Sequence, residues 1–260
     1  MVRRSRAILA WIVVLLGGGL TFLGWTDSLM AQGSDERLNE YRLTTVTSMP
    51  LSEKYILFSY LGYVVSPSSR VKSLYFSPPG LIIRPKPWIE LWGAVFGIYN
   101  ENEEVYDTLE VRPLVGVKLY VPNTLKMNMF SWTRFEYRRF STNGSRSNNS
   151  VPRLRNRLGI EFPMRQATAW NPGTLYGLAD VEPVYRYDEA RLDYTRLRGG
   201  IGYVLNKTWR AEFIYHAQYQ GPDGSKKDFG QNIWRLNIKL NLPPRGGHVD
   251  GAQNVPDIDD

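Results

Sequence analysis

The segment Arg153-Leu-Arg-Asn-Arg-Leu-Gly-Ile-Glu-Phe-Pro-Met164 alternates charged and apolar side chains with a period of two. In an extended strand, successive side chains point to opposite faces, so the residues separate into two sets. One set is Leu154, Asn156, Leu158, Ile160, Phe162 and Met164; the other is Arg153, Arg155, Arg157 and Glu161. The segment therefore predicts a strand with one mainly apolar face and one charged face.

Segments of this kind recur along the chain, separated by clusters of Pro, Gly, Asn and Ser. Ten are recognised, at 55–64, 69–76, 88–99, 109–120, 126–140, 153–164, 175–187, 195–205, 209–219 and 234–242. An even number of strands suits bacterial outer-membrane barrels. We therefore expect an all-β fold, an antiparallel up-and-down transmembrane β-barrel of about ten strands, within a range of about eight to twelve.

The N-terminus has the layout of a secretory signal peptide. Arg3, Arg4 and Arg6 precede an apolar run over 7–23, and the small residues Ala31 and Gly33 follow it. An uncleaved inner-membrane anchor is the alternative, because the run is near the lower limit for spanning a bilayer, but Gly17 to Gly19 interrupt it. The predicted division is a signal peptide over 1–31, a polar segment over 32–53, the barrel over 54–242 and a disordered polar tail over 243–260.

The composition of the 260 residues excludes several chemistries. There is no cysteine, which rules out disulfides, cysteine-ligated metals and lipid attachment through an N-terminal cysteine. The formal charge of +7 falls to +5 without the leader's three arginines and single aspartate, Asp27. Such a surplus does not indicate nucleic-acid binding, and we expect none.

Aromatic residues, which make up 13% of the chain, gather near the ends of the predicted strands. This placement is typical of the girdles that barrels carry at lipid headgroups, whereas a soluble barrel more often holds its aromatics at mid-strand. The predicted aromatic girdle is Tyr55, Tyr63, Trp88, Tyr99, Tyr203, Trp209 and Tyr219.

The polar face carries charges of both signs at interleaved positions. Across a narrow lumen, guanidinium and carboxylate groups from neighbouring strands would satisfy one another where water is scarce. The alternative is an ordinary solvated surface on a soluble barrel with an apolar interior. The predicted lumen charge network is Glu110, Arg112, Arg134, Glu136, Arg138, Arg153, Arg155, Arg157, Glu161, Glu182, Arg196, Arg198, Arg210 and Glu212.

Three motifs give the chain a family resemblance: Trp132-Thr-Arg-Phe-Glu-Tyr-Arg138, Arg153-Leu-Arg-Asn-Arg-Leu-Gly159 and Arg196-Leu-Arg-Gly-Gly-Ile-Gly202. With the last Gly-Tyr and Tyr-His-Ala-Gln-Tyr strands, they resemble the bacterial outer-membrane family catalogued as domain of unknown function 2490, over about 48–242. The resemblance implies a barrel with a charged interior and no established activity. The last strand ends at Leu242, without the terminal aromatic residue of many outer-membrane proteins.

The sequence offers no convincing active site. His216 lies on the polar face of its strand without a nucleophilic Ser beside it, which favours a hydrogen-bonding role in the lumen over catalysis. The strand glutamates have arginines nearby on the same face, and salt-bridged carboxylates make poor general acids. Gly199, Gly200 and Gly202 are interpreted as strand glycines that allow bending or leave room for arginines opposite. We expect no cofactor and no metal.

The sequence thus predicts a non-enzymatic outer-membrane protein, either a narrow channel that prefers anions or a structural protein of the envelope. Its expected partners are outer-membrane lipid, the barrel-assembly machinery during insertion and, for a channel, small solutes. Two other hypotheses are kept: a lipid-modifying barrel enzyme that uses His216, and a soluble periplasmic barrel that binds an apolar ligand.

Overall fold

The computed structural model describes residues 38–67, 70–102, 106–122, 127–142, 150–164, 171–220 and 228–243, and these form eleven strands. Their bounds are β1 Leu38–Pro50, β2 Tyr55–Ser66, β3 Val71–Lys86, β4 Ile89–Asn102, β5 Thr108–Val121, β6 Asn128–Thr142, β7 Ser150–Pro163, β8 Leu175–Arg186, β9 Arg191–Val204, β10 Trp209–Gln220 and β11 Asp228–Asn241. The expected signal peptide, and the expected tail beyond residue 243, lie outside the described residues. None of the described residues forms a helix long and apolar enough to cross a membrane.

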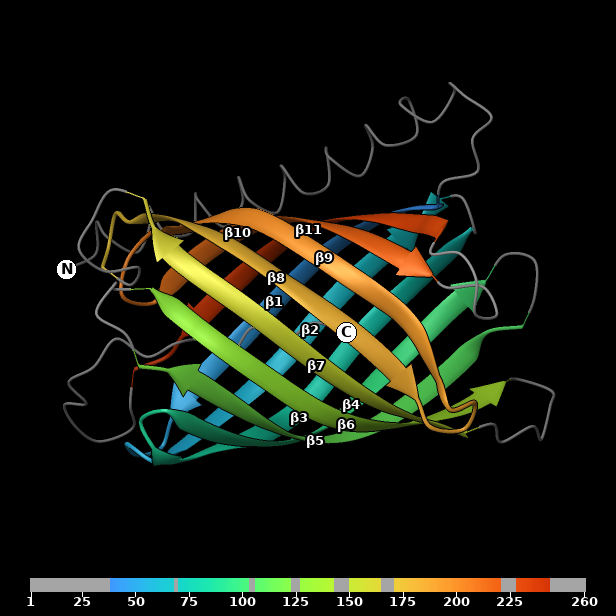
Figure 1. Cartoon of the computed structure of the whole chain (residues 1–260), viewed down its shortest axis with the longest axis horizontal. Coiled ribbons are helices and arrows are strands. Elements are labelled where there is room, and N and C mark those ends of the chain that lie inside the picture. Colours follow the sequence, from blue (N-terminus) through green and yellow to red (C-terminus); the bar gives the residue numbers. More distant parts are fainter. Residues whose placement is uncertain are drawn as a thin grey trace, which may run out of the picture. The chain divides into compact units, whose positions relative to one another are not determined.

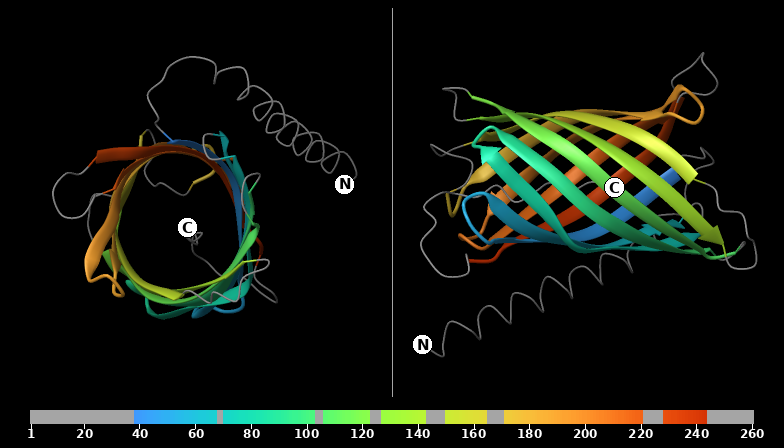
Figure 2. Two further views of the ribbon diagram at one scale, coloured as in Figure 1. Left: turned by 90° about the vertical axis from the view of Figure 1, so that its right-hand side faces the viewer. Right: turned by 90° about the horizontal axis from the view of Figure 1, so that it is seen from below.

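The strands form one closed barrel (Figures 1 and 2). Each strand pairs antiparallel with the next along the chain, whereas β1 pairs parallel with β11 and closes the ring. The predicted all-β barrel is confirmed, and all ten predicted strands are present. The expectation of an even number is wrong for the described chain, because an eleventh strand makes the closing pair parallel.

The additional strand is β1, which lies in the segment expected to be a polar lead-in, so the barrel begins at Leu38 and not at residue 54. Three of its residues, Thr44, Thr45 and Thr47, fall on both faces and obscure the alternation of apolar and polar positions. Thr44 instead joins β1 to β11: its hydroxyl donates to Asn237 Oδ1 at 2.9 Å and accepts from Arg235 Nε at 2.9 Å. These hydrogen bonds hold the polar strand β1 against β11 in the barrel wall.

Strand β3 continues to Lys86, although the sequence predicts its end at Phe76. The pairing with β4 is irregular between Phe76 and Leu81, where Pro78 and Pro79 cannot donate to the ladder. The Ser77 hydroxyl lies within hydrogen-bond distance of the Val95 carbonyl, at 3.0 Å, and joins the two strands there. Pro78 and Pro79, which are typical of a turn in the sequence, therefore lie at an irregularity inside a long strand.

The two faces of the wall have opposite chemistry. On β7, Leu158 faces outward with 52% of its surface exposed, whereas Arg155 and Arg157 face inward and are 1% and 0% exposed. The alternation found in 153–164 therefore separates an exposed apolar outer face from a buried charged interior. The same split extends over β5, where Val111, Val115 and Val117 are exposed and the intervening Arg112 is buried.

Several strand glycines lie opposite aromatic rings. Gly202 pairs with Tyr176 across β8 and β9, and a Cβ at Gly202 would lie 2.2 Å from that ring. Gly97 has the same relation to Phe76, at 2.2 Å. The interpretation that Gly202 leaves room for an arginine is thus wrong, because Tyr176 covers it.

Candidate functional site

The barrel interior, built from the inward-facing side chains, is the candidate site, and it has two parts. Strands β1 to β6 contribute a buried cluster of Val46, Ile56, Phe58, Tyr60, Ile82, Trp92, Phe96, Leu114, Phe130 and Trp132. Its rings are in contact, with centroid distances of 5.1 Å between Phe58 and Trp92 and 5.0 Å between Trp92 and Trp132. This aromatic part was not expected, because on β2 and β4 both faces are largely apolar and periodicity alone does not distinguish them.

The charged part centres on Glu182 of β8. Its carboxylate accepts hydrogen bonds from Arg155 at 2.6 Å and Arg157 at 3.1 Å, both on β7, and lies 3.5 Å from Arg134 on β6. All four side chains are buried. The alternation of β7 puts Arg155 and Arg157 side by side on one face, so one carboxylate on the adjacent strand reaches both.

A second carboxylate, Glu136 of β6, reinforces this centre. It lies 2.7 Å from Arg134 Nε and accepts a hydrogen bond from Arg155 NH1 at 3.2 Å. Arg134 and Arg155 are directly opposite across β6 and β7, an arrangement that would be repulsive without these carboxylates. The Arg134 guanidinium also lies 4.4 Å from the centre of the Trp132 ring, where the charged part meets the aromatic part.

Further ion pairs extend the network on either side. Glu110 of β5 accepts from Arg112 at 2.8 Å and from Arg138 at 2.6 Å. On β8 and β9, Arg198 Nε donates to Asp180 at 2.7 Å. Separations of 3.9 Å between Arg112 and Glu136 and between Arg157 and Asp180 connect these pairs to the centre, so the charged part runs continuously from β5 to β9.

Near β11 the interior holds a smaller cluster around Glu212. Its carboxylate accepts from the Tyr176 hydroxyl at 2.6 Å and from Asn237 at 2.8 Å, and pairs with Lys239 at 2.7 Å. Glu212 is thus held by one cation and two neutral donors.

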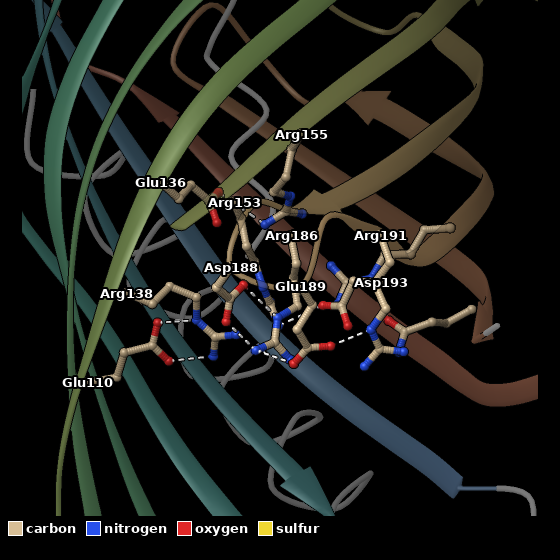
Figure 3. A network of polar contacts seen from close by, with 12 residues as sticks. Glu110, Glu136, Arg138, Arg153, Arg155, Arg186, Asp188, Glu189, Arg191 and Asp193 are labelled. Atoms are coloured by element: carbon tan, nitrogen blue, oxygen red, sulfur yellow. Dashed lines mark hydrogen bonds and ion pairs between the residues drawn. The ribbon is translucent and has the colours of Figure 1, made fainter. Parts of the chain in front are cut away.

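At the end of the barrel where β8 turns into β9, the network reaches the rim (Figure 3). Arg153 pairs with Asp193 at 2.7 Å, and the pairing of β8 with β9 shifts at this point, consistent with a bulge at Asp193. In the turn, Arg186 pairs with Asp188 and with Glu189, each at 2.6 Å. The hydrogen bond from Arg186 lowers the pKa of the Asp188 carboxyl below its ordinary value.

The fourteen residues of the predicted charge network all lie on strands whose charged faces point inward. Eight belong to the ion-pair chain around Glu110, Glu136 and Glu182, and Arg198 adjoins it. Four others have separate partners: Arg153 pairs with Asp193, Glu161 accepts from Asn128 at 2.8 Å, Arg196 donates to Gln218 at 2.7 Å, and Glu212 pairs with Lys239. Arg210 is buried on β10 opposite Lys239.

The predicted network leaves out several inward charges. Arg42 lies on the unrecognised β1, while Lys118, Asp180, Arg235 and Lys239 lie on the polar faces of recognised strands. The alternation of β11 carries the signal for Arg235 and Lys239, because both face away from Trp234 and Leu236.

The predicted girdle residues all face outward or lie in a turn, and they fall at both ends of the barrel. Tyr55, Trp88, Tyr203 and Trp209 lie at the end that holds the β1–β2 turn, here named the β1–β2 end. Tyr63, Tyr99 and Tyr219 lie at the opposite end, the β2–β3 end. Tyr55 and Trp88, both 46% exposed, are typical of the set.

His216 of β10 faces inward and is completely buried. Neither of its ring nitrogens has a hydrogen-bond partner among the described residues. Its position on the polar face agrees with the sequence, but the expected hydrogen bonds to the lumen are not present within the described chain. In the same residues no group of His, Asp and Glu could hold a metal ion.

These features define a class of protein, a closed β-barrel with an exposed apolar outer face and a buried interior that combines ion pairs with aromatic rings. The chain belongs to the family described as "Protein of unknown function (DUF2490)", which matches it over residues 39–228. This confirms the resemblance seen in the arginine-rich strand motifs. No curated protein and no solved structure matches the chain.

Proposed function

We propose that this protein is a non-enzymatic β-barrel of the bacterial outer membrane. The observation that carries this proposal is that apolar side chains are exposed on the outside while charged side chains are buried in the interior. Thirty large apolar side chains of the described residues are exposed, while eleven Arg and Lys and six Glu side chains are buried. Soluble proteins rarely bury charges in such numbers or expose so large an apolar surface, whereas a lipid-facing wall requires it.

The strands also have the length and charge placement of a membrane wall. They contain 12 to 16 residues, and a tilted strand of about 9–11 residues crosses the hydrocarbon core. Among the strand side chains that the structure describes, the charges at outward positions are Lys72, Glu101 and Arg139, all near strand ends at the β2–β3 end. The aromatic girdle residues flank the apolar band between the two ends, as expected at headgroup depth.

The interior supports a barrel filled by its own side chains. In a wide aqueous pore, inward side chains would be accessible to water, but Arg134, Arg155 and Arg157 are at most 1% exposed. A structural role in the envelope is therefore favoured. The buried Arg and Lys side chains outnumber the buried carboxylates, which supports a narrow anion pathway as the second candidate function.

The position of His216 argues against a lipid-modifying enzyme. A catalytic histidine acting on membrane lipid would have to reach the outer face and pair with a nucleophile. His216 is buried inside, and its ring nitrogens form no hydrogen bond with a described residue. The exposed apolar outer face likewise disfavours a soluble barrel.

Fractionation and conductance together test the proposal. The protein should require detergent for extraction from the outer-membrane fraction, and unheated samples should migrate differently from boiled ones on gels. In planar bilayers a filled barrel gives no steady conductance, whereas rare small anion-selective openings would favour the second candidate. Recovery in the soluble periplasmic fraction would refute the membrane proposal, and phospholipid or lipid A turnover that is lost in His216→Ala would refute the non-enzymatic one.

A further inference from the structure

The outer face of the barrel carries a group of polar side chains near the middle of β6 and β7. Ser131 and Thr133 point outward from β6, and Asn156, the seventh of the 14 residues of β7, is directly opposite Thr133. The Asn156 amide donates to the Thr133 hydroxyl at 2.7 Å and to the Ser131 hydroxyl at 3.3 Å. We name these three residues the Asn156 patch. Exposed apolar side chains border it, with Val117 opposite Thr133 and Leu158 opposite Ser131.

The Asn156 patch has hydrogen-bonding groups that no described residue satisfies. Both hydroxyl groups accept from the Asn156 amide, but neither donates to a described residue. The side-chain carbonyl of Asn156 accepts no hydrogen bond from a described residue either. The patch therefore presents two hydroxyl donors beside one carbonyl acceptor on the outside of the wall.

Another outward asparagine, Asn232, differs in this respect. It lies near the start of β11, where its side-chain carbonyl accepts from the Tyr215 hydroxyl at 2.6 Å and its amide donates to Asn39 at 3.1 Å. The carbonyl and the amide of Asn232 are thus both satisfied within the barrel wall. Asn156 combines a position nearer the middle of its strand with an unsatisfied acceptor.

The argument for a partner rests on the proposed membrane location. In the middle of a bilayer, acyl chains offer no hydrogen bonds and water is absent, so an unsatisfied polar group is costly there. Lipid headgroups lie at the membrane surface and do not reach a residue at mid-depth. Another protein surface that brings both acceptors and donors to this depth would remove the cost.

We propose that the Asn156 patch is the contact surface of a symmetric dimer of this chain. Two copies inserted in the same direction are related by a two-fold axis along the membrane normal, which brings residues of equal depth together. Asn156 of one copy then faces the same patch on the other copy. Because the patch holds donors and an acceptor side by side, it is complementary to itself. Each Asn156 carbonyl accepts from the polar hydrogens of the second copy, and Val117 and Leu158 pack around these hydrogen bonds.

Analytical ultracentrifugation of the purified full-length protein in detergent measures the dimer. Asn156→Leu removes two hydrogen bonds between the copies, one from each, and should raise the dissociation constant by about tenfold. Asn232→Leu is the matched control, because it makes the same change at an outward position whose hydrogen bonds lie within one chain. It should leave the dissociation constant unchanged. Heat-modifiable gel mobility establishes that each variant is folded.

Cross-linking in lipid vesicles locates the contact surface without altering the polar groups. The chain has no cysteine of its own, so a single introduced thiol reports on one position. Leu158→Cys, at the border of the patch, should form a disulfide between two copies on oxidation. Leu61→Cys is the control: Leu61 is 56% exposed, against 52% for Leu158, and lies on β2 at the opposite side of the ring. It should stay uncross-linked.

A monomeric wild type would overturn the proposal, as would a dimer that Asn156→Leu and Asn232→Leu weaken equally. Equal cross-linking at residues 61 and 158 would also exclude the Asn156 patch as the contact surface. Fractionation separates these failures from a failure of the membrane proposal. A monomer that is extracted from the outer membrane refutes the dimer alone, whereas recovery in the soluble periplasmic fraction refutes both.

Discussion

Glu182 shows how a single carboxylate holds the charged interior together. It contacts Arg155, Arg157 and Arg134 from two other strands while remaining 1% exposed. We expect Glu182→Gln to lower the free energy of unfolding by about 3–5 kcal/mol, because it leaves buried guanidinium groups without their counter-charge. Urea unfolding of the refolded barrel, followed by tryptophan fluorescence, measures the effect.

Glu189→Gln is the matched control, since Glu189 also pairs with two arginines but lies in the exposed β8–β9 turn. Exposed pairs contribute roughly 0–1 kcal/mol, so this substitution should be nearly neutral. Equal effects of the two substitutions would mean that the interior is hydrated and that Glu182 contributes no more to stability than an exposed carboxylate.

Gly202 tests the contact between a strand glycine and an aromatic ring. Gly202→Ala should displace the Tyr176 ring and disturb its hydrogen bond to Glu212, with a cost of about 1–3 kcal/mol. Gly199→Ala is the control, because nothing lies within 4 Å of a Cβ at that position. The temperature at which the unheated gel band disappears should fall for Gly202→Ala alone; a similar fall for both would contradict the steric explanation.

At the residue scale, the inward charges were predictable wherever alternation was clear. Arg155 and Glu161 follow a strict period of two on β7, and both are buried. Partners were not predictable, because strand register decides whether Glu182 meets Arg155 or Arg196. The aromatic part was missed for another reason: near Phe58 and Trp92 both faces of the strands are rich in apolar residues, and periodicity then carries no information.

Among the elements, β1 has the least typical place, because it pairs antiparallel with β2 and parallel with β11. Thr44 contributes two side-chain hydrogen bonds to the parallel pair, with Asn237 and Arg235. Thr44→Val should therefore destabilise the barrel by about 1–3 kcal/mol, since it leaves buried polar groups unsatisfied.

Thr45→Val is the control for this prediction, because the Thr45 side chain points to the outer face, where an apolar residue suits the wall. It should be neutral or slightly stabilising. Hydrogen exchange should show faster opening of β1 and β11 in Thr44→Val and no change in Thr45→Val. Faster exchange in both variants would show that the strand depends on β propensity and not on the interior hydrogen bonds.

The elements themselves were largely predictable, with two instructive failures. The alternation predicts ten strands, but it does not predict β1, because the threonines of β1 suit either face. Strand β3 was cut short at Phe76, since Pro78 and Pro79 read locally as a turn and only the pairing with β4 shows the continuation to Lys86. In both cases the missing information is strand pairing. For β1 it is the pairing with β11, far away in the sequence, and for β3 it is the pairing with β4 beyond the irregularity.

For the whole molecule, the proposed membrane location predicts that the cost of placing a charge on the outer face depends on its depth in the membrane. Leu158, exposed near the middle of β7, should tolerate arginine poorly in lipid bilayers, with a cost of about 2–4 kcal/mol. Leu109, exposed near the start of β5, should tolerate the same substitution at about 0–1 kcal/mol. Unfolding in lipid vesicles compares the variants, and similar small effects at both positions would indicate an outer face in contact with water.

The parallel pairing of β1 with β11 has a consequence for labelling the protein. Strand β1 starts at the β2–β3 end, whereas β11 finishes at the β1–β2 end, where the Leu242 amide donates to the Ser48 carbonyl at 2.8 Å. An epitope inserted just before Leu38 and one inserted just after Pro243 should therefore emerge on opposite sides of a barrel that spans a membrane. Antibody added to intact cells would reach one of them and not the other.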